Sequence, residues 1–226
     1  IKSVKLITSS NGKTTEVVAK YVISDTRMQV FIPQGLNAKG GVVKIKIDFS
    51  FIAPFEGSDR MGVLETKNGK IFTMAQWYPR MCVYDDVRGW NTNPYLGASE
   101  FYLEYGDFDV KITTPSNHVV VCSGELVNPT EVYSSEEQKR LAQAKLSDAT
   151  VLIRSAAEVN ALTKTVSTTK TWHYKIKSAR DVSWASSQAF ILDGAKINLP
   201  YMLLCNSCNG PGVHSGIHAL ASRILT

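Results

Sequence analysis

Histidine and cysteine are the residue types in this chain best suited to metal chemistry, and one histidine pair has informative spacing. His214 and His218 stand four residues apart, which places two imidazoles on one helical face, as in the zinc-binding pattern His-Glu-x-x-His. Ser215 stands where that pattern has its general base, and a serine hydroxyl does not act as a base at neutral pH. The other two histidines, His118 and His173, have no partner at this spacing. The sequence therefore predicts no zinc-dependent hydrolysis by this chain alone.

The same terminal segment offers a second arrangement for a metal. Zinc accepts all four side chains of the set Cys205, Cys208, His214 and His218. A bound ion would stabilise a segment that is otherwise rich in glycine. Only five residues separate Cys208 from His214, whereas roughly twelve separate the two ligand pairs of a common zinc finger. The alternative interpretation is a Gly-rich tail that contains these residues by chance.

The elements that would position such groups are mostly β-strands. Residues 43–51 alternate five apolar side chains with charged or small polar ones, the pattern of a strand with one buried face. Residues 107–113 and 171–177 repeat this alternation, and turn signals such as Asn68-Gly69 and Asn128-Pro129 separate the strands. The pattern predicts a mainly β fold with large twisted sheets, mixed or antiparallel, in a saddle or sandwich-like arrangement.

One segment has the composition of a helix. Residues 136–146 are good helix formers with acids in the first turn and a lysine in the last, and Ser134 and Ser135 precede them as potential caps. Apolar positions are few in this segment. We therefore expect one short surface helix between strands.

The most unusual stretch of the chain runs from Gln76 to Trp90 and concentrates aromatic, charged and turn-forming residues. Tyrosine and tryptophan need partners for their polar atoms when buried, and Pro79 fixes φ and removes a backbone donor. Two interpretations remain: the segment lines a functional surface, or it forms a buried aromatic corner between two sheets. Asp85-Asp86 is better suited to a turn than to a metal site, because adjacent residues of an extended segment point apart.

Several segments of the chain, including the one around Gln76, resemble a known protein family. The runs 72–80, 84–90 and 100–110, supported by Trp172-His173-Tyr174 and by residues 180–185, are similar to the amino-terminal domain of aminopeptidase N-like zinc metallopeptidases, the gluzincins. The resemblance extends over residues 1–200, and residues 201–226 are either a divergent tail or the start of a missing catalytic domain. It implies a large β domain that precedes the catalytic domain and closes one side of its active site.

The resemblance also implies the cofactor and the substrate contacts. In this family the catalytic domain holds the zinc through a His-Glu-x-x-His helix and a distant glutamate, so zinc is expected in the missing domain and no cofactor in this chain. A Gln-x-Glu or Gln-x-Gln loop helps to bind the amino terminus of the peptide substrate, and Gln76-Trp77-Tyr78 matches it. Tyr78 replaces the acid or amide, so a charge-assisted contact becomes a neutral hydrogen bond or a cation–π contact.

Composition argues against several other kinds of protein, such as nucleic-acid-binding, membrane-spanning and disulfide-rich ones. The net charge of +5 is spread among acids without a basic stripe, which argues against nucleic acid as a partner. No apolar run approaches the roughly 20 residues of a membrane span. Four cysteines in 226 residues do not form a disulfide framework. The resemblance suggests the cell envelope or secretion as the location.

Two hypotheses follow from different classes. The first is a non-catalytic domain that shapes the substrate pocket and docks on its own catalytic domain. The second is a free-standing β-sandwich module that binds a protein or a glycan. A domain that docks on a neighbour exposes more apolar surface than an independent monomer tolerates, whereas an independent module has a polar surface.

Overall fold

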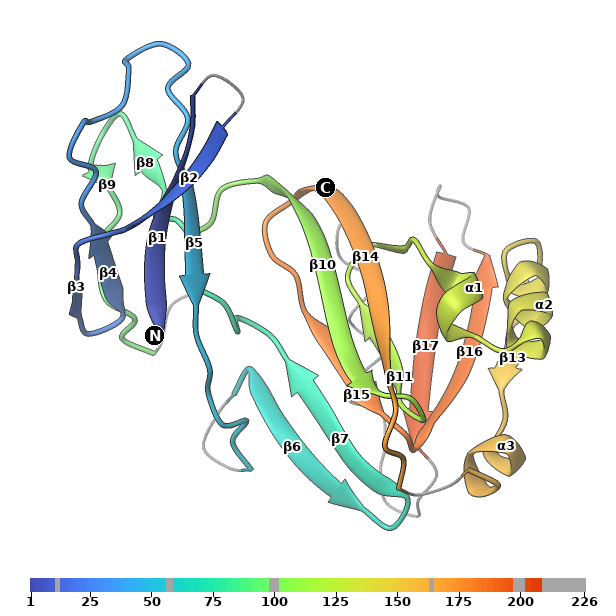
Figure 1. The fold of residues 1–226 in the computed structure, drawn as a ribbon. Helices are drawn as coiled ribbons and strands as arrows, with labels where there is room; N and C mark the ends of the chain where they lie inside the picture. Colours follow the sequence, from blue (N-terminus) through green and yellow to red (C-terminus); the bar gives the residue numbers. More distant parts are fainter. Residues whose placement is uncertain (11–12, 56–58, 98–101, 163–164, 197–201, 209–226) are drawn as a thin grey trace. The chain divides into compact units, whose positions relative to one another are not determined.

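The computed structural model describes residues 1–10, 13–55, 59–97, 102–162, 165–196 and 202–208 (Figure 1). Strands make up 45% of the chain and helices 10%, which confirms the mainly β fold. All strand pairs in this part of the chain are antiparallel. The chain forms two compact units, one from Ile1–Ile52 with Tyr78–Glu104 and the other from Ala53–Trp77 with the described residues from Tyr105 onward.

The first unit contains a three-stranded sheet in the order β2-β1-β5 and two separate hairpins, β3-β4 and β8-β9. Its strands are β1 (Ser3–Ser10), β2 (Lys13–Val18), β3 (Tyr21–Ser24), β4 (Arg27–Val30), β5 (Lys44–Asp48), β8 (Tyr84–Asp85) and β9 (Gly89–Trp90). The alternation predicted for residues 43–51 is confirmed only over β5, where Ile45 and Ile47 pair with Leu6 and Val4 of β1. Val43 and residues 49–51, also expected in this strand, lie outside it. Val4 and Leu6 form the buried core of the unit with Ala19, and Ile45 and Ile47 pack against it.

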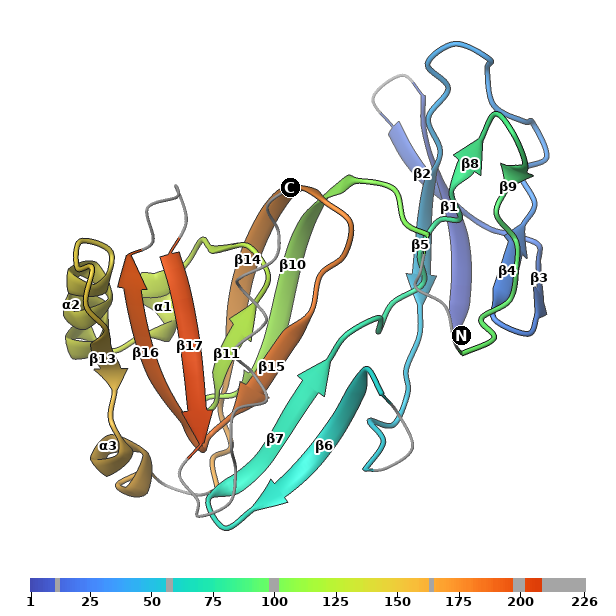
Figure 2. The ribbon, with the colours of Figure 1, turned by 180° about the vertical axis from the view of Figure 1, so that it is seen from behind.

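The second unit contains three sheets, in the orders β11-β15-β7-β6, β10-β14-β12 and β13-β16-β17. Its strands are β6 (Met61–Thr66), β7 (Gly69–Met74), β10 (Gly106–Pro115), β11 (Val119–Cys122), β12 (Glu125–Leu126), β13 (Val151–Arg154), β14 (Thr169–Ala179), β15 (Trp184–Ser187), β16 (Phe190–Lys196) and β17 (Met202–Cys208). The views from both sides show β10 beside β14 and β16 beside β17 (Figure 2).

The core of the second unit lies on the inner face of the β10-β14 pair. Ile112 of β10 stands opposite Trp172 of β14, and both are buried, as the alternation of residues 107–113 and 171–177 predicts. Tyr174 follows on the same face and donates a hydrogen bond from its hydroxyl to the backbone oxygen of Val120, 2.7 Å away. Burial of apolar side chains from strands and helices together stabilises this unit.

The predicted helix is α2 (Ser135–Ala144), which packs along β13 and β16. Ser134 caps it, because the Ser134 hydroxyl accepts a hydrogen bond from the Glu137 backbone and the Glu137 carboxylate accepts one from the Ser134 backbone. Two shorter helices, α1 (Pro129–Val132) and α3 (Ala156–Asn160), were not predicted. The turn predicted at Asn128-Pro129 is instead the start of α1, because proline suits the first position of a helix.

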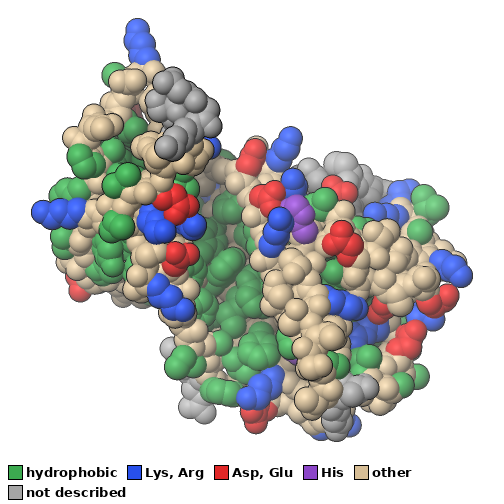
Figure 3. Space-filling model, viewed as in Figure 1, with side chains coloured by type: hydrophobic (Ala, Val, Ile, Leu, Met, Phe, Trp, Pro, Cys, Tyr) green, Lys and Arg blue, Asp and Glu red, His purple; other side chains and the backbone are tan. Residues whose placement is uncertain are grey.

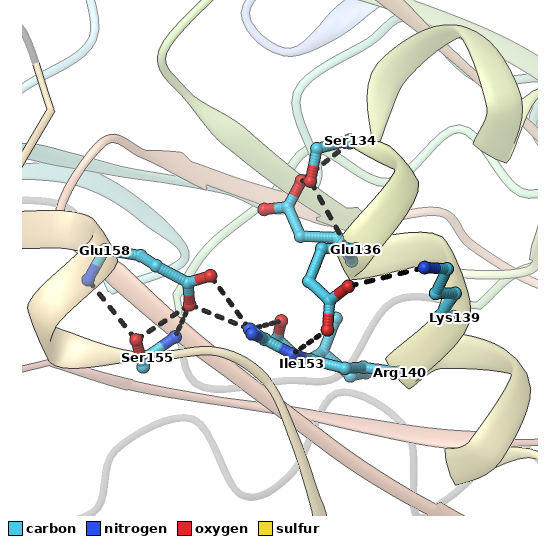
Figure 4. A network of polar contacts seen from close by, with 8 residues as sticks. Ser134, Glu136, Lys139, Arg140, Ile153, Ser155 and Glu158 are labelled. Carbon is cyan, nitrogen blue, oxygen red and sulfur yellow. Dashed lines mark hydrogen bonds and ion pairs between the residues drawn. The ribbon is translucent and has the colours of Figure 1, made fainter.

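A second capping box links α3 to α2 (Figure 4). Glu158 accepts hydrogen bonds from the backbone and the hydroxyl of Ser155, and its two carboxylate oxygens each lie 2.9 Å from Nη1 of Arg140. Arg140 also pairs with Glu136 and donates to the backbone oxygen of Ile153. The hydrogen bonds from Ser155, followed by that from Arg140, lower the pKa of Glu158 below its usual value.

This depressed pKa makes the contribution of Glu158 depend on pH. The contribution is complete above the unfolded-state pKa of about 4.3 and is lost as the pH falls through the lower folded-state value. We expect Glu158→Gln to reduce the free energy of unfolding at pH 7 by about 1 kcal/mol or less, as for partly exposed ion pairs, and to have less effect at pH 3. Urea unfolding at both pH values measures this, with Glu125→Gln on β12 as an exposed control. An effect that grows toward pH 3 would contradict it.

Candidate functional site

Gln76 lies in a bend directly after β7 and has an unusual backbone conformation. Its φ is +54°, a left-handed value that only three described non-glycine residues adopt. Such a conformation costs a side-chain-bearing residue about 1–2 kcal/mol, and residues held in this way are frequent at functional sites. Its side chain is half-buried, and no described residue forms a hydrogen bond with its amide. The Gln76 amide is therefore available to a ligand.

Trp77 is fixed by two contacts within the second unit. Its Nε1 donates a hydrogen bond to the backbone oxygen of Val182, 3.1 Å away, and its ring meets Trp184 edge to face with centroids 6.3 Å apart. Sequence reasoning missed these partners, although residues 180–185 were already part of the resemblance. Trp77 therefore anchors the chain next to Gln76 to the residues around Val182 and Trp184, as the aromatic-corner interpretation expects.

Tyr78 belongs to the other unit, because the boundary between the units falls between Trp77 and Tyr78. The guanidinium carbon of Arg80 lies 5.6 Å from the centroid of the Tyr78 ring, a cation–π contact. The predicted substrate-binding triplet is thus divided: Gln76 and Trp77 end one compact segment and Tyr78 begins the next. One face of the Tyr78 ring is occupied by a cation of the chain itself.

The following hairpin carries two aromatic rings at the surface. Tyr84 and Trp90 form a cross-strand pair with ring centroids 5.2 Å apart, and they are 64% and 54% exposed. The Asp85 carboxylate accepts hydrogen bonds from the backbone N–H groups of Val87 and Arg88, at 3.0 and 2.7 Å. This confirms the turn role expected for Asp85. The hairpin therefore does not belong to a buried corner.

Large apolar side chains are exposed at many of the described positions of this segment of the first unit. They are Met81, Tyr84, Val87, Trp90, Tyr95, Leu96 and Tyr102. Val87 and Leu96 are the extreme cases, at 86% and 87% exposure. Figure 3 shows that hydrophobic side chains also reach the surface over the part that contains β1 to β5, whereas charged side chains surround α2. Exposed apolar side chains that gather in one patch are typical of a protein–protein contact, whereas single ones are ordinary.

His118, His173 and Cys122 have structural surroundings. His173 Nε2 lies 2.7 Å from an Asp109 oxygen, as expected for a hydrogen-bonded histidine. His118 Nδ1 contacts the Ser186 hydroxyl at 2.9 Å, and burial lowers the pKa of His118. Burial also raises the pKa of the Cys122 thiol to about 12, so the thiolate is absent at neutral pH.

The weaker metal alternative falls largely outside the described residues. His214 and His218 lie there, and Cys205 and Cys208 are placed only as backbone positions of β17, paired with Asp193 and Phe190. Among the residues that are described, no three histidine, cysteine, aspartate or glutamate side chains gather as a metal site would require. Within the same ranges no helix combines the length and the apolar character needed to cross a bilayer.

In comparisons with known proteins, the chain matches no protein-family model, no curated protein and no solved structure.

Proposed function

We propose that this chain is the non-catalytic amino-terminal domain of an aminopeptidase-like zinc metallopeptidase, and that it docks on its own catalytic domain and shapes the substrate pocket there. The observation that carries the proposal is the row of exposed apolar side chains between Met81 and Tyr102. This row lies in the same segment as the residues that resemble the family. In this proposal zinc and the catalytic residues belong to the catalytic domain.

The exposed row supplies a physical reason for docking. Fully burying one large apolar side chain contributes about 1.5–3 kcal/mol, so a partner that covers only the Tyr84–Trp90 pair and its neighbours gains a substantial driving force. Aromatic residues are also the types that contribute most to the centre of protein interfaces. The alternative, a free-standing module, is expected to have a polar surface, and it is not favoured by these side chains.

Gln76 is the residue that we assign to substrate binding with the strongest structural support. Its backbone has a defined left-handed conformation, Trp77 anchors the adjacent position, and its amide has both a donor and an acceptor for a peptide. Tyr78 contributes in this proposal as a neutral group near the substrate amino terminus. Its stacking against Arg80 disfavours an ammonium on that face of the ring, because two cations would meet there.

Replacing Gln76 by glycine separates the functional role from the structural one. Glycine adopts φ near +54° without strain, so Gln76→Gly is expected to raise the free energy of unfolding by about 1 kcal/mol. In the enzyme that contains the catalytic domain, the same change is expected to lower kcat/KM for peptides about tenfold, the effect of one lost hydrogen bond to a charged group. Urea unfolding and steady-state kinetics measure the two effects.

Asp25→Gly provides the matched control. Asp25 has φ of +53° in the exposed turn between β3 and β4, so its replacement removes the same strain at a position without the proposed role. We expect a similar gain in stability and unchanged kinetics. If Gln76→Gly also left kcat/KM unchanged for all peptides tested, Gln76 would not contact the substrate.

A further inference from the structure

Arg154, at the end of β13, is a buried cation without a contacting anion. The residue is 4% exposed, and its Nη2 donates to two neutral acceptors, the backbone oxygens of Asn117 and Gln188, each 3.3 Å away. No ion pair to Arg154 occurs among the described residues; Glu137 and Glu158 act on it only through longer-range attraction. A guanidinium remains charged in proteins, and buried charges are normally paired. Arg154 therefore provides positive potential that the fold does not neutralise by contact.

Gln188 connects Arg154 to a pocket in the same unit. The Gln188 Nε2 donates to the backbone oxygen of Asn68 at 3.0 Å, and its Oε1 accepts from Nδ2 of Asn117 at 2.7 Å. Gly69 packs so closely on Gln188 that a Cβ at this position would collide with the Gln188 amide. These contacts fix Gln188 between Arg154 and the turn that joins β6 to β7. The wall is thus rigid before any ligand binds.

The pocket has a volume of about 200 Å³ and is lined by Asn68, Val159, Asn160, Leu162 and Gln188. The turn after β6 and helix α3, which supply most of these residues, lie at the same end of the unit in both views (Figures 1 and 2). The side-chain amides of Asn68 and Asn160 form no hydrogen bond with the described residues. Each has an NH2 group that can donate to a ligand. The pocket therefore offers two available donors, and Arg154, which does not line it, lies behind its wall in contact with the backbone oxygen of Gln188.

We propose that this pocket binds a carboxylate group, which accepts hydrogen bonds from the amides of Asn68 and Asn160 and is held by the field of Arg154. The volume is below the 300–1,000 Å³ typical of drug-sized ligands, and it suits a small group. One buried cation matches the single negative charge of a carboxylate. The group can belong to a small free acid or to the carboxyl terminus of a peptide. This site is independent of the proposed enzyme function, since none of the residues that line it is assigned to substrate binding or docking there.

The test is a titration of the ¹⁵N-labelled 226-residue chain, followed by the side-chain amide signals of Asn68 and Asn160. The probes are sodium acetate, N-acetyl-trialanine and the amidated form of that peptide, with ionic strength held constant by sodium chloride. We expect saturable shifts of both amides with acetate. Tighter binding of the free-acid peptide than of acetate, with none for the amidated peptide, identifies a peptide terminus, whereas equal affinities identify a free carboxylate.

Variants assign the contacts. Asn160→Ala changes an exposed residue, so the fold is expected to persist, and Arg154→Gln removes the charge. Asn160→Ala is expected to weaken acetate binding about tenfold, the loss of a hydrogen bond to a charged group. Arg154→Gln is expected to weaken acetate binding as well, because it removes the positive field behind the pocket. Gln143→Ala, which removes an exposed amide on α2, is the control and should change nothing. If Arg154→Gln does not fold, the acetate affinities of Asn160→Ala and Asn68→Ala test the proposal. No saturable shift, or unchanged affinity in Asn160→Ala, would overturn the proposal.

Discussion

Replacing Trp172 by alanine is expected to lower the free energy of unfolding of the second unit by about 3–5 kcal/mol, the range for removing a buried aromatic side chain. Trp172 is 1% exposed, meets Tyr133 edge to face at 5.2 Å between centroids, and stands opposite Ile112. Its removal leaves a cavity that strands of an antiparallel pair close only in part. Urea unfolding followed by circular dichroism measures the loss.

Trp90→Ala is the matched control for this prediction. Trp90 is 54% exposed on the β8-β9 hairpin, so its truncation removes little buried area. We expect a loss of about 1 kcal/mol or less, as for surface positions. Losses of similar size for Trp172→Ala and Trp90→Ala would show that the core does not lie on the β10-β14 pair.

Replacing Gly124 by alanine is expected to destabilise the same unit by about 2–3 kcal/mol, through backbone strain and a steric clash. Gly124 has φ of +97°, and a Cβ there would lie 2.5 Å from the backbone oxygen of Lys175 and 2.8 Å from Cβ of Ile176. The atoms that would have to move belong largely to the backbone of β14, the central strand of its sheet. Thermal unfolding measures the change.

Gly106 serves as the comparison, because a Cβ added to it meets nothing within 4 Å. Gly106→Ala, in the neighbouring strand β10, is expected to change stability by less than about 1 kcal/mol. An equal effect of the two substitutions would mean that general strand propensity, not the close approach of Gly124 to Lys175, determines the loss.

Local patterns in the sequence were sufficient for β5, β10, β14 and the principal helix, but most of the other strands were not predicted. The alternation of residues 171–177 predicts which face of β14 is buried, and the acids behind Ser134 predict the start of α2 within about one residue. Such signals depend on neighbouring residues alone. The helices α1 and α3 were not predicted, because four or five residues are too few to show a helical period in the sequence.

The candidate site was predictable only in part. Its composition marked Gln76 to Trp90 as unusual, and the turn at Asp85 followed from residue type. The anchoring of Trp77 on Val182 joins residues 105 positions apart, and no local pattern specifies such a contact. The left-handed backbone of Gln76 and the burial of Arg154 depend likewise on surroundings assembled by distant segments.

The proposed function requires a catalytic domain that holds zinc. The most direct test is to read the coding sequence that follows the codon for Thr226 and to measure the zinc content of the polypeptide translated through it. We predict a His-Glu-x-x-His motif with a later glutamate and about one bound zinc ion per polypeptide. A continuation without this motif, or a polypeptide that binds no zinc, would contradict the proposed function.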